Sequence, residues 1–223
     1  MTLCYNLGMK DFLISLLDWI YKKKCYFCRS SKECVKMCSE CYNELSHLAL
    51  APQRIVEGKK VFCAGIYSKH LQKLIRGLKY HNQRDLAYFL ARFMYDYWLQ
   101  ITESNQFEVV PVPIFPKREK QRKYNHMNLV AEEFSKLTGN EVNTNLIKRI
   151  RNTKPQYNLK RHERIQNLAN AFVVNKEYYK GKTIMLLDDI CTTGTTFEEM
   201  IKELQKVGIT DIVCFAATTP FGE

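Results

Sequence analysis

The stretch TIMLLDDICTTGTT, residues 183–196, decides the fold of this chain. Its first six residues are almost all apolar and do not alternate with polar ones, which predicts a strand buried on both faces. A polar loop over 192–196 follows, and apolar residues then recur at helical spacing over 197–207, before Gly208. Residues 211–217 form another apolar strand. This order of strand, loop, helix and strand predicts an α/β fold with a parallel sheet flanked by helices.

The same kinds of element extend toward the N-terminus. Short apolar runs predict two further strands, at 61–67 and 107–113. Helical spacing of apolar residues predicts four helices, at 11–21, 70–80, 85–100 and 128–137. The chain has 223 residues, which suits one domain of moderate size with a small appendage, and it shows no repeat of fixed period.

Two adjacent carboxylates, Asp188 and Asp189, follow the first of these strands. Ligands of open α/β sheets bind at the carboxyl ends of the strands, so a ligand is expected here. The loop that follows offers hydroxyl groups, a glycine and the amides of a helix N-terminus, which together suit a phosphate. The carboxylates suit hydroxyl groups beside that phosphate, so the pattern describes a ribose 5-phosphate site. A simple Asp-Asp turn with threonine N-caps is the alternative, and an ATP-binding P-loop is disfavoured because no lysine follows Gly194.

Four cysteines form a second candidate site. Cys25 and Cys28 make one C-x-x-C pair, and Cys38 and Cys41 make another. Each pair presents two thiolates to one tetrahedral ion, which predicts a structural zinc site with four cysteine ligands. Such a site would hold together a segment too poor in apolar residues to fold alone. The alternative is four unrelated free cysteines. Within a metal site, Cys34 between the two pairs is a candidate substitute ligand.

The other cysteines carry no comparable pattern. We expect Cys4, Cys63 and Cys214 to be buried or free thiols. Cys191 lies in the polar loop, but no partner in the sequence indicates that it is a nucleophile.

The charge is strongly positive and unevenly distributed. Lys and Arg total 34 against 23 Asp and Glu, a net charge of +11. Residues 117–164 hold 13 basic and 5 acidic residues, whereas residues 183–223 hold 2 basic and 7 acidic ones. This balance favours polyanionic partners such as nucleic acid, phosphorylated small molecules or an anionic membrane surface. A solvated basic face is the alternative.

A membrane span is not expected. The longest apolar stretch, residues 12–20, is interrupted by Asp18 and is much shorter than the ~20 residues that a spanning helix needs. It precedes a run of lysines and lacks a cleavage site, so it does not match a signal peptide. We therefore expect a cytoplasmic protein, in which the cysteines bind metal or remain free thiols.

The sequence LLDDICTTGTT at 186–196 closely resembles the phosphoribosyl pyrophosphate (PRPP) signature of type I phosphoribosyltransferases. Together with the cysteine pairs, VVPVPIFPKREKQRKYNH at 109–126 and KPQYNLKRHERIQNLANAF at 154–172 resemble the competence protein F (ComF) family. The resemblance covers nearly the whole chain from Cys25 onward. It implies a zinc-ribbon-like cysteine module over 25–60 and a type I phosphoribosyltransferase-like domain over 61–223. Residues 1–24 lie outside the resemblance, and their apolar spacing predicts an N-terminal helix.

The resemblance also implies roles for single residues. Asp188 and Asp189 would bind the ribose hydroxyls and serve as the catalytic carboxylates. The loop that would hold the 5-phosphate comprises Thr192, Thr193, Gly194, Thr195 and Thr196. The pyrophosphate loop would contain Lys117, Arg118 and Arg122, and Lys79 would join the PRPP site. A mobile lid would span residues 148–164 and carry the cations Arg149, Arg151, Lys154 and Arg164. Mg²⁺ would bridge pyrophosphate and ribose oxygens.

Two departures from the implied pattern are visible. Purine-type phosphoribosyltransferases usually carry an aspartate base where this chain has Thr192, which disfavours a hypoxanthine- or guanine-type reaction. The RGFNQ pattern of the ComF family is replaced by RKYNH at 122–126, which keeps the arginine and asparagine but loses the glycine. The conformation of this loop is therefore an open question.

Two functional hypotheses follow. The first is a PRPP-binding protein that handles or takes up single-stranded DNA in natural transformation, in contact with the DNA-uptake machinery, as the resemblance implies. The basic central segment and its tyrosines suit backbone neutralisation and base stacking. The alternative is an active phosphoribosyltransferase, a glycosyltransferase that moves ribose 5-phosphate from PRPP to a nucleobase or another acceptor.

Overall fold

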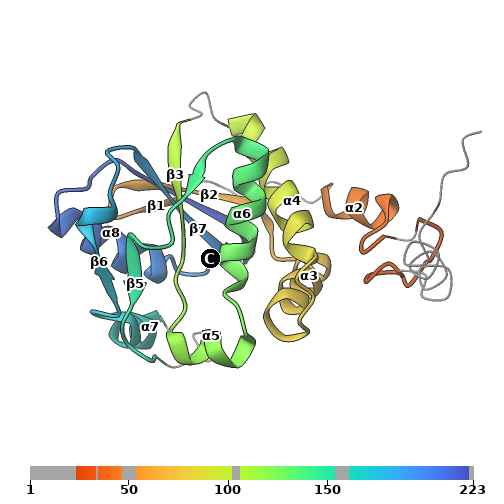
Figure 1. Ribbon diagram of the computed structural model, residues 1–223, viewed down its shortest axis with the longest axis horizontal. Coiled ribbons are helices and arrows are strands. Elements are labelled where there is room, and N and C mark those ends of the chain that lie inside the picture. The colour runs from red at the N-terminus through yellow and green to blue at the C-terminus, as the bar shows by residue number, and fades with distance from the viewer. Residues whose placement is uncertain (1–23, 34, 47–53, 102–105, 154–160, 221–223) are drawn as a thin grey trace, which may run out of the picture. The chain divides into compact units, whose positions relative to one another are not determined.

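The computed structural model of the protein describes residues 24–33, 35–46, 54–101, 106–153 and 161–220 (Figure 1). The chain divides into two compact units, residues 1–44 and 45–223. The helix predicted over 11–21 lies outside the described residues. In the first unit, the described residues contain the cysteine pairs, and the helix α2 (Ser39–Ser46) begins between Cys38 and Cys41.

A six-stranded sheet forms the centre of the second unit, in the order β1-β2-β8-β7-β3-β4. Five strands are parallel, and β1 pairs with β2 in antiparallel fashion at one edge. The strands are β1 (Arg54–Val56), β2 (Lys59–Ile66), β3 (Phe107–Pro111), β4 (Glu141–Val142), β7 (Thr183–Ile190) and β8 (Ile212–Thr219). The parallel sheet predicted from the sequence is therefore confirmed, and β7 lies inside it between β8 and β3.

Helices cover both faces of this sheet (Figure 1). The helices are α3 (Lys69–Tyr80), α4 (Leu86–Ile101), α5 (Pro116–Arg122), α6 (His126–Thr138), α7 (Arg161–Leu168) and α8 (Thr195–Lys206). On one face, α4 and α6 pack on the strands through an aromatic cluster that includes Trp98, Phe134 and Phe215. On the other face, apolar residues of α8 pack against β2, β7 and β8. The strands of the sheet interior are buried on both faces, which explains their continuous apolar sequence.

A small hairpin lies beside α8. Its strands are β5 (Ile147–Arg149) and β6 (Phe172–Val174), which are antiparallel, and a 3₁₀ turn follows at Lys176–Tyr178. These strands were not predicted from the sequence, and neither were β1, β4, α2, α5 and α7. The predicted strands and helices between residues 61 and 217 are all present, but the loop expected over 192–196 ends at Gly194, because α8 already begins at Thr195.

No helix among the described residues combines the length and apolarity that crossing a membrane would require.

Candidate functional site

Strand β7 carries Asp188 and Asp189 to the carboxyl edge of the sheet. Successive side chains of a strand point to opposite faces, so the two carboxylates serve different surroundings. Asp189 faces the side covered by α3 and α6, where it contacts Lys79 and His126. Asp188 lies on the other side, where its charge interacts with that of Arg149. The sheet thus places two acidic groups next to each other and gives each a different electrostatic environment.

Asp189 is the centre of a buried ionic cluster. Its Oδ2 atom lies 2.6 Å from Lys79 Nζ and 2.5 Å from His126 Nε2. The side chains of Asp189 and His126 are only 5% and 4% exposed, and that of Lys79 is 20% exposed. Burial disfavours the charged carboxylate, but the Lys79 charge and the hydrogen bond with His126 outweigh it and hold the pKa of Asp189 below its usual range. Asp189 is therefore ionised and fixed in position.

His126 was not selected as a site residue from the sequence. It begins α6, directly after Asn125, whose side chain caps the helix by accepting a hydrogen bond from Met127 N. Burial lowers the pKa of His126, although its hydrogen bond with Asp189 opposes that shift. The sequence did offer one signal for His126, its position as the last residue of RKYNH. The family pattern RGFNQ has glutamine at that position, and the glutamine side chain also donates hydrogen bonds.

Asp188 has the opposite electrostatic behaviour. The surrounding protein atoms disfavour its charged form and the neighbouring Asp189 charge repels it, so that the pKa of Asp188 is raised to about 7. Its Oδ1 atom accepts a hydrogen bond of 2.8 Å from Asp189 N. Near neutral pH this carboxyl is thus partly protonated in the ligand-free protein, and a cation or a ring of hydroxyl donors would favour its ionised form.

The loop after β7 is short, and it lies against strand β1. Gly194 stands at the N-cap of α8 with a φ angle of +80°, a left-handed conformation that favours glycine. A Cβ atom at this position would lie 2.8 Å from Val56 Cγ2 of β1. The hydroxyl groups of Thr193 and Thr195 lie 2.8 Å apart. These hydroxyls and the first amides of α8 therefore meet at one point, which suits an anion.

Strand β1 supports this loop from the edge of the sheet. Arg54 Nη1 donates a hydrogen bond of 2.5 Å to Thr192 O. Arg54 and Val56 lie in the segment that the sequence analysis assigned to the cysteine module, and their contact with residues 192–194 was not predicted. No local pattern could have indicated it, because it depends on the pairing of β1 with β2.

Cys191 lies beneath the loop. It is buried, and its thiol is a close neighbour of the Cys63 thiol on β2. The neighbouring Cys191 thiol and burial together raise the pKa of Cys63. Cys63 and Cys214 are free and buried, as expected, whereas Cys4 and Cys34 lie outside the described residues.

Two arginines meet in front of the carboxyl edge. Arg118 of α5 donates a hydrogen bond to Thr153 O, and Arg149 of β5 donates one to Thr153 Oγ1. Burial and the Arg118 charge lower the pKa of Arg149 to about 10, and Arg149 Nε has no hydrogen-bond partner among the described residues. Two partly desolvated guanidinium groups in such proximity favour a bound anion.

The remaining basic residues of the expected site are more dispersed. Arg122 lies with its Cζ atom 5.2 Å from the ring centroid of Tyr80, and Lys117 is exposed on α5. Arg151 donates a hydrogen bond to Ala169 O. Lys154 and the side chain of Arg164 lie outside the described residues. The structure therefore brings Arg118 and Arg149 together, and it describes only part of the expected lid.

The loop before α6 keeps a turn that glycine favours. Lys123 stands where the family pattern has glycine, and it adopts a left-handed conformation with φ +66°. The turn thus has the left-handed conformation that glycine adopts most readily, and the lysine accepts the steric cost of that conformation.

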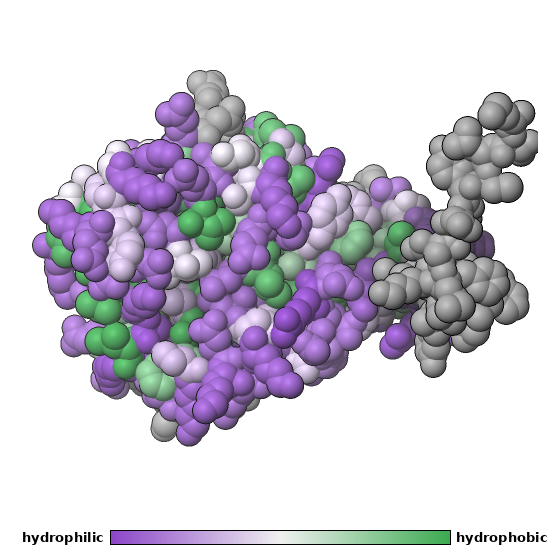
Figure 2. Space-filling model, viewed as in Figure 1, coloured by the Kyte–Doolittle hydropathy of each residue, from purple (hydrophilic) through white to green (hydrophobic). Residues whose placement is uncertain are grey.

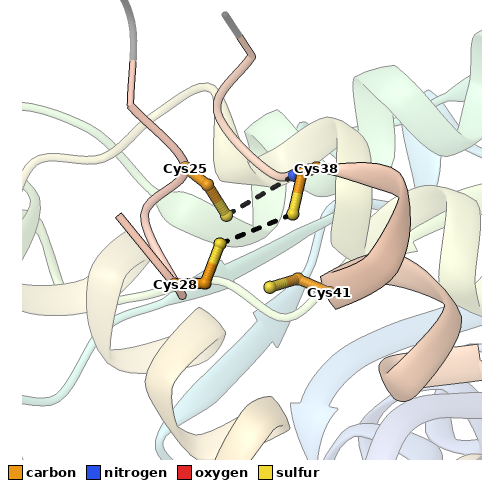
Figure 3. A group of neighbouring side chains, drawn as sticks. All are labelled: Cys25, Cys28, Cys38 and Cys41. Carbon is orange, nitrogen blue, oxygen red and sulfur yellow. Dashed lines mark hydrogen bonds between the residues drawn. The ribbon is translucent and has the colours of Figure 1, made fainter. Parts of the chain in front are cut away.

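The four cysteines of the N-terminal unit converge (Figure 3). The Sγ atoms of Cys25, Cys28, Cys38 and Cys41 all lie within 4.8 Å of one another. Burial disfavours the Cys25 thiolate, but backbone N–H groups, including that of Cys38, donate to its Sγ atom and lower its pKa to about 6. Four thiol groups around one point, one of them readily ionised, fit a tetrahedral zinc ion.

Comparisons with known proteins find similarity to a phosphoribosyl transferase domain and to several bacterial proteins. The family model of the phosphoribosyl transferase domain matches residues 129–219 of the chain. Competence protein F of Haemophilus influenzae is 29% identical to the chain over 198 residues, which cover 84% of this chain and 86% of that protein. The DNA utilization protein YhgH of Salmonella typhimurium is 26% identical to the chain over 193 residues, and the YhgH protein of Escherichia coli K12 is 24% identical over the same length. Each of these two matches covers 82% of this chain and 85% of the relative.

Proposed function

Because the chain is a homologue of competence protein F and of YhgH and carries a phosphoribosyl transferase domain, we propose that it binds PRPP and acts in the handling or uptake of single-stranded DNA during natural transformation. The observation that carries the PRPP part is the arrangement at the end of β7. Two carboxylates, one fixed by Lys79 and His126, stand beside a loop whose hydroxyls and amides converge at the N-terminus of α8.

Each part of PRPP has a counterpart in this arrangement. Asp188 and Asp189 accept hydrogen bonds from the ribose hydroxyls. The loop from Thr192 to Thr196 binds the 5-phosphate, with Gly194 in the conformation that lets the amides approach it. The pyrophosphate lies toward Arg118 and Arg149, whose guanidinium groups meet at Thr153. Mg²⁺ fits this site because its hard oxygen ligands would come from the pyrophosphate and ribose, with few from the protein.

Binding of PRPP as a ligand is supported better than transfer of its ribose 5-phosphate to a purine. Thr192 stands where a purine-type enzyme carries an aspartate base, and a threonine hydroxyl does not accept a proton at neutral pH. Pyrophosphate release from PRPP in the presence of a nucleobase would instead establish the transferase alternative.

The cysteine cluster holds one structural zinc ion in this proposal. Its support is the convergence of four Sγ atoms within 4.8 Å and the N–H groups directed at Cys25. We also propose a cytoplasmic location, where a reducing environment keeps these thiols available to zinc.

Binding of a labelled oligothymidylate, measured by fluorescence anisotropy at increasing salt, tests the DNA part of the proposal. A protein that binds through phosphates loses affinity steeply with salt, with a slope of about −0.7 per phosphate contact for single strands. We expect a steep slope because residues 117–164 carry a surplus of eight basic residues. Absence of binding at low salt, or a flat salt dependence, would contradict a direct role in DNA handling.

A further inference from the structure

Arginines and tyrosines form a cluster at the surface beside the proposed PRPP site. We call it the arginine–tyrosine surface and define it by Arg76, Tyr80, Arg84, Arg122 and Tyr124. The Cζ atoms of Arg122 and Arg76 lie 5.2 Å and 5.9 Å from the ring centroid of Tyr80. The Cζ atom of Arg84 lies 4.6 Å from the ring centroid of Tyr124. Three cations and two aromatic rings from α3, its C-terminal turn and the end of α5 therefore meet on one surface.

The charges of this surface are available to a ligand. Among the described residues, the ion pairs include none with Arg76, Arg84 or Arg122. Residues 76–84 contain three basic and no acidic residues, and residues 116–124 contain five basic and one acidic residue. Hydrophilic residues gather over α5 in Figure 2. The local field is thus strongly positive and favours a polyanion.

Of the two aromatic rings of the surface, one is accessible and one is buried. Tyr80 ends α3, and 58% of its surface is exposed, which is high for a large aromatic residue. Tyr124, in contrast, is buried and its hydroxyl donates a hydrogen bond to Leu78 O, so it fixes the segment before α6 against α3. Tyr80 therefore offers a ring to a ligand, while Tyr124 and Arg84 maintain the surface around it.

We propose that this surface binds single-stranded DNA, with one base stacked on Tyr80 and the adjacent phosphates paired with Arg76, Arg84 and Arg122. This inference rests on the proposed function, and it assigns a location to the DNA. An exposed ring beside arginines that form no ion pair with the described residues suits single-strand binding, since stacking needs an unpaired base and each arginine neutralises a phosphate. Lys79 precedes Tyr80 and contacts Asp189, so the DNA lies directly beside the PRPP site.

Variants that leave the proposed PRPP residues intact test this location. Anisotropy of fluorescein-labelled dT20 is measured for the full chain, for Tyr80→Ala, for Tyr80→Phe and for Arg76→Gln/Arg84→Gln. Arg92→Gln, on the surface of α4 and paired with Asp96, loses one positive charge and serves as a control for net charge. A 20-base-pair duplex and PRPP titration are run on the same preparations.

We expect Tyr80→Ala to weaken dT20 binding by about fivefold or more, because loss of one stacked base costs about 1–3 kcal/mol. Tyr80→Phe keeps the ring and stays within about twofold of the wild type. The double arginine variant reduces the salt slope by about 1.4, for two lost phosphate contacts. Arg92→Gln leaves the slope unchanged, PRPP binding persists in all variants, and the duplex binds more weakly than dT20.

Two outcomes overturn the proposal in different ways. If the wild type binds dT20 and the surface variants bind equally well, or if Arg92→Gln has the same effect as the surface variants, the DNA lies elsewhere and the proposed function stands. If the wild type does not bind dT20 at all, the proposed DNA function and this location fail together.

Discussion

Substitution of Gly194 by alanine tests whether the loop after β7 is held in its conformation by the structure around it. A residue with a Cβ atom at φ +80° pays about 1–2 kcal/mol for the left-handed conformation. The new Cβ would also lie 2.8 Å from Val56 Cγ2, and such overpacking costs about 1–3 kcal/mol. Alanine restricts the unfolded chain, which offsets about 0.4–1 kcal/mol. The expected loss in the free energy of unfolding is therefore about 1–4.6 kcal/mol.

Gly139 provides the matched control. It also has a positive φ angle, +74°, but a Cβ atom there would have nothing within 4 Å. The cost of the left-handed conformation and the restriction of the unfolded chain are therefore nearly equal for Gly194→Ala and Gly139→Ala, and they cancel when the two costs are subtracted. The difference in cost isolates the contact with Val56, and we expect it to be about 1–3 kcal/mol.

Urea unfolding followed by circular dichroism measures these costs. With an m value of about 2.5 kcal/mol/M, a loss of 2.5 kcal/mol moves the midpoint by about 1 M. Adding Val56→Ala to Gly194→Ala should cost less than the sum of the single substitutions, because the γ-methyl groups are gone. Equal costs for Gly194→Ala and Gly139→Ala, or strict additivity with Val56→Ala, would refute the close support of the loop by β1.

The remaining predictions concern charge, backbone and metal. Asp188→Asn should stabilise the ligand-free protein at pH 8 and have little effect near pH 4. The reason is that a carboxyl with a folded pKa of about 7 lowers the stability of the wild type as the pH rises from about 4 to 7. Urea midpoints at both pH values measure this effect, and a destabilisation at pH 8 would contradict the prediction. Asp189→Asn should destabilise by about 3 kcal/mol at pH 8, since it leaves Lys79 and His126 without their anion; the same titration applies, and an unchanged midpoint would be inconsistent with the ionic cluster. Lys123→Gly should stabilise by about 1 kcal/mol by relieving the left-handed strain at φ +66°, and a lower melting temperature would argue against that conformation. Cys41→Ala should reduce bound zinc from one equivalent per chain to almost none, measured by mass spectrometry of the metal content, whereas Cys214→Ala should retain it; equal zinc in both would exclude the four-cysteine site.

Most of the fold could be predicted from local sequence patterns. The strand β7, the loop and the helix α8 were predictable because their apolar runs and the spacing from Phe197 to Val207 are local properties. The cysteine cluster was predictable for the same reason, since two C-x-x-C pairs lie within 17 residues. Strand β1 was not, because three residues among polar neighbours become a strand only through pairing with β2.

The site shows the same division between local and distant determinants. Asp188, Asp189 and the threonine loop form one continuous motif, and the resemblance to a known signature indicated Lys79. His126 was missed because its contact is with Asp189, 63 residues later in the chain, and its place in RKYNH was a weak signal on its own. The hydrogen bond from Arg54 to Thr192 spans 138 residues and was hidden for the same reason.

The most direct test of the central claim is calorimetric titration of PRPP with Mg²⁺ into the zinc-loaded wild type and into Asp188→Asn. Asp188→Asn is expected to be at least as stable as the wild type, so a loss of binding cannot be attributed to unfolding. Asp96→Asn, on the surface of α4, changes the charge equally and serves as the control. The account predicts micromolar binding in the wild type and in Asp96→Asn, and a loss of about 30-fold or more (about 2 kcal/mol) in Asp188→Asn. No binding by the folded wild type, or equal binding by Asp188→Asn, would contradict a ribose-phosphate site at the end of β7.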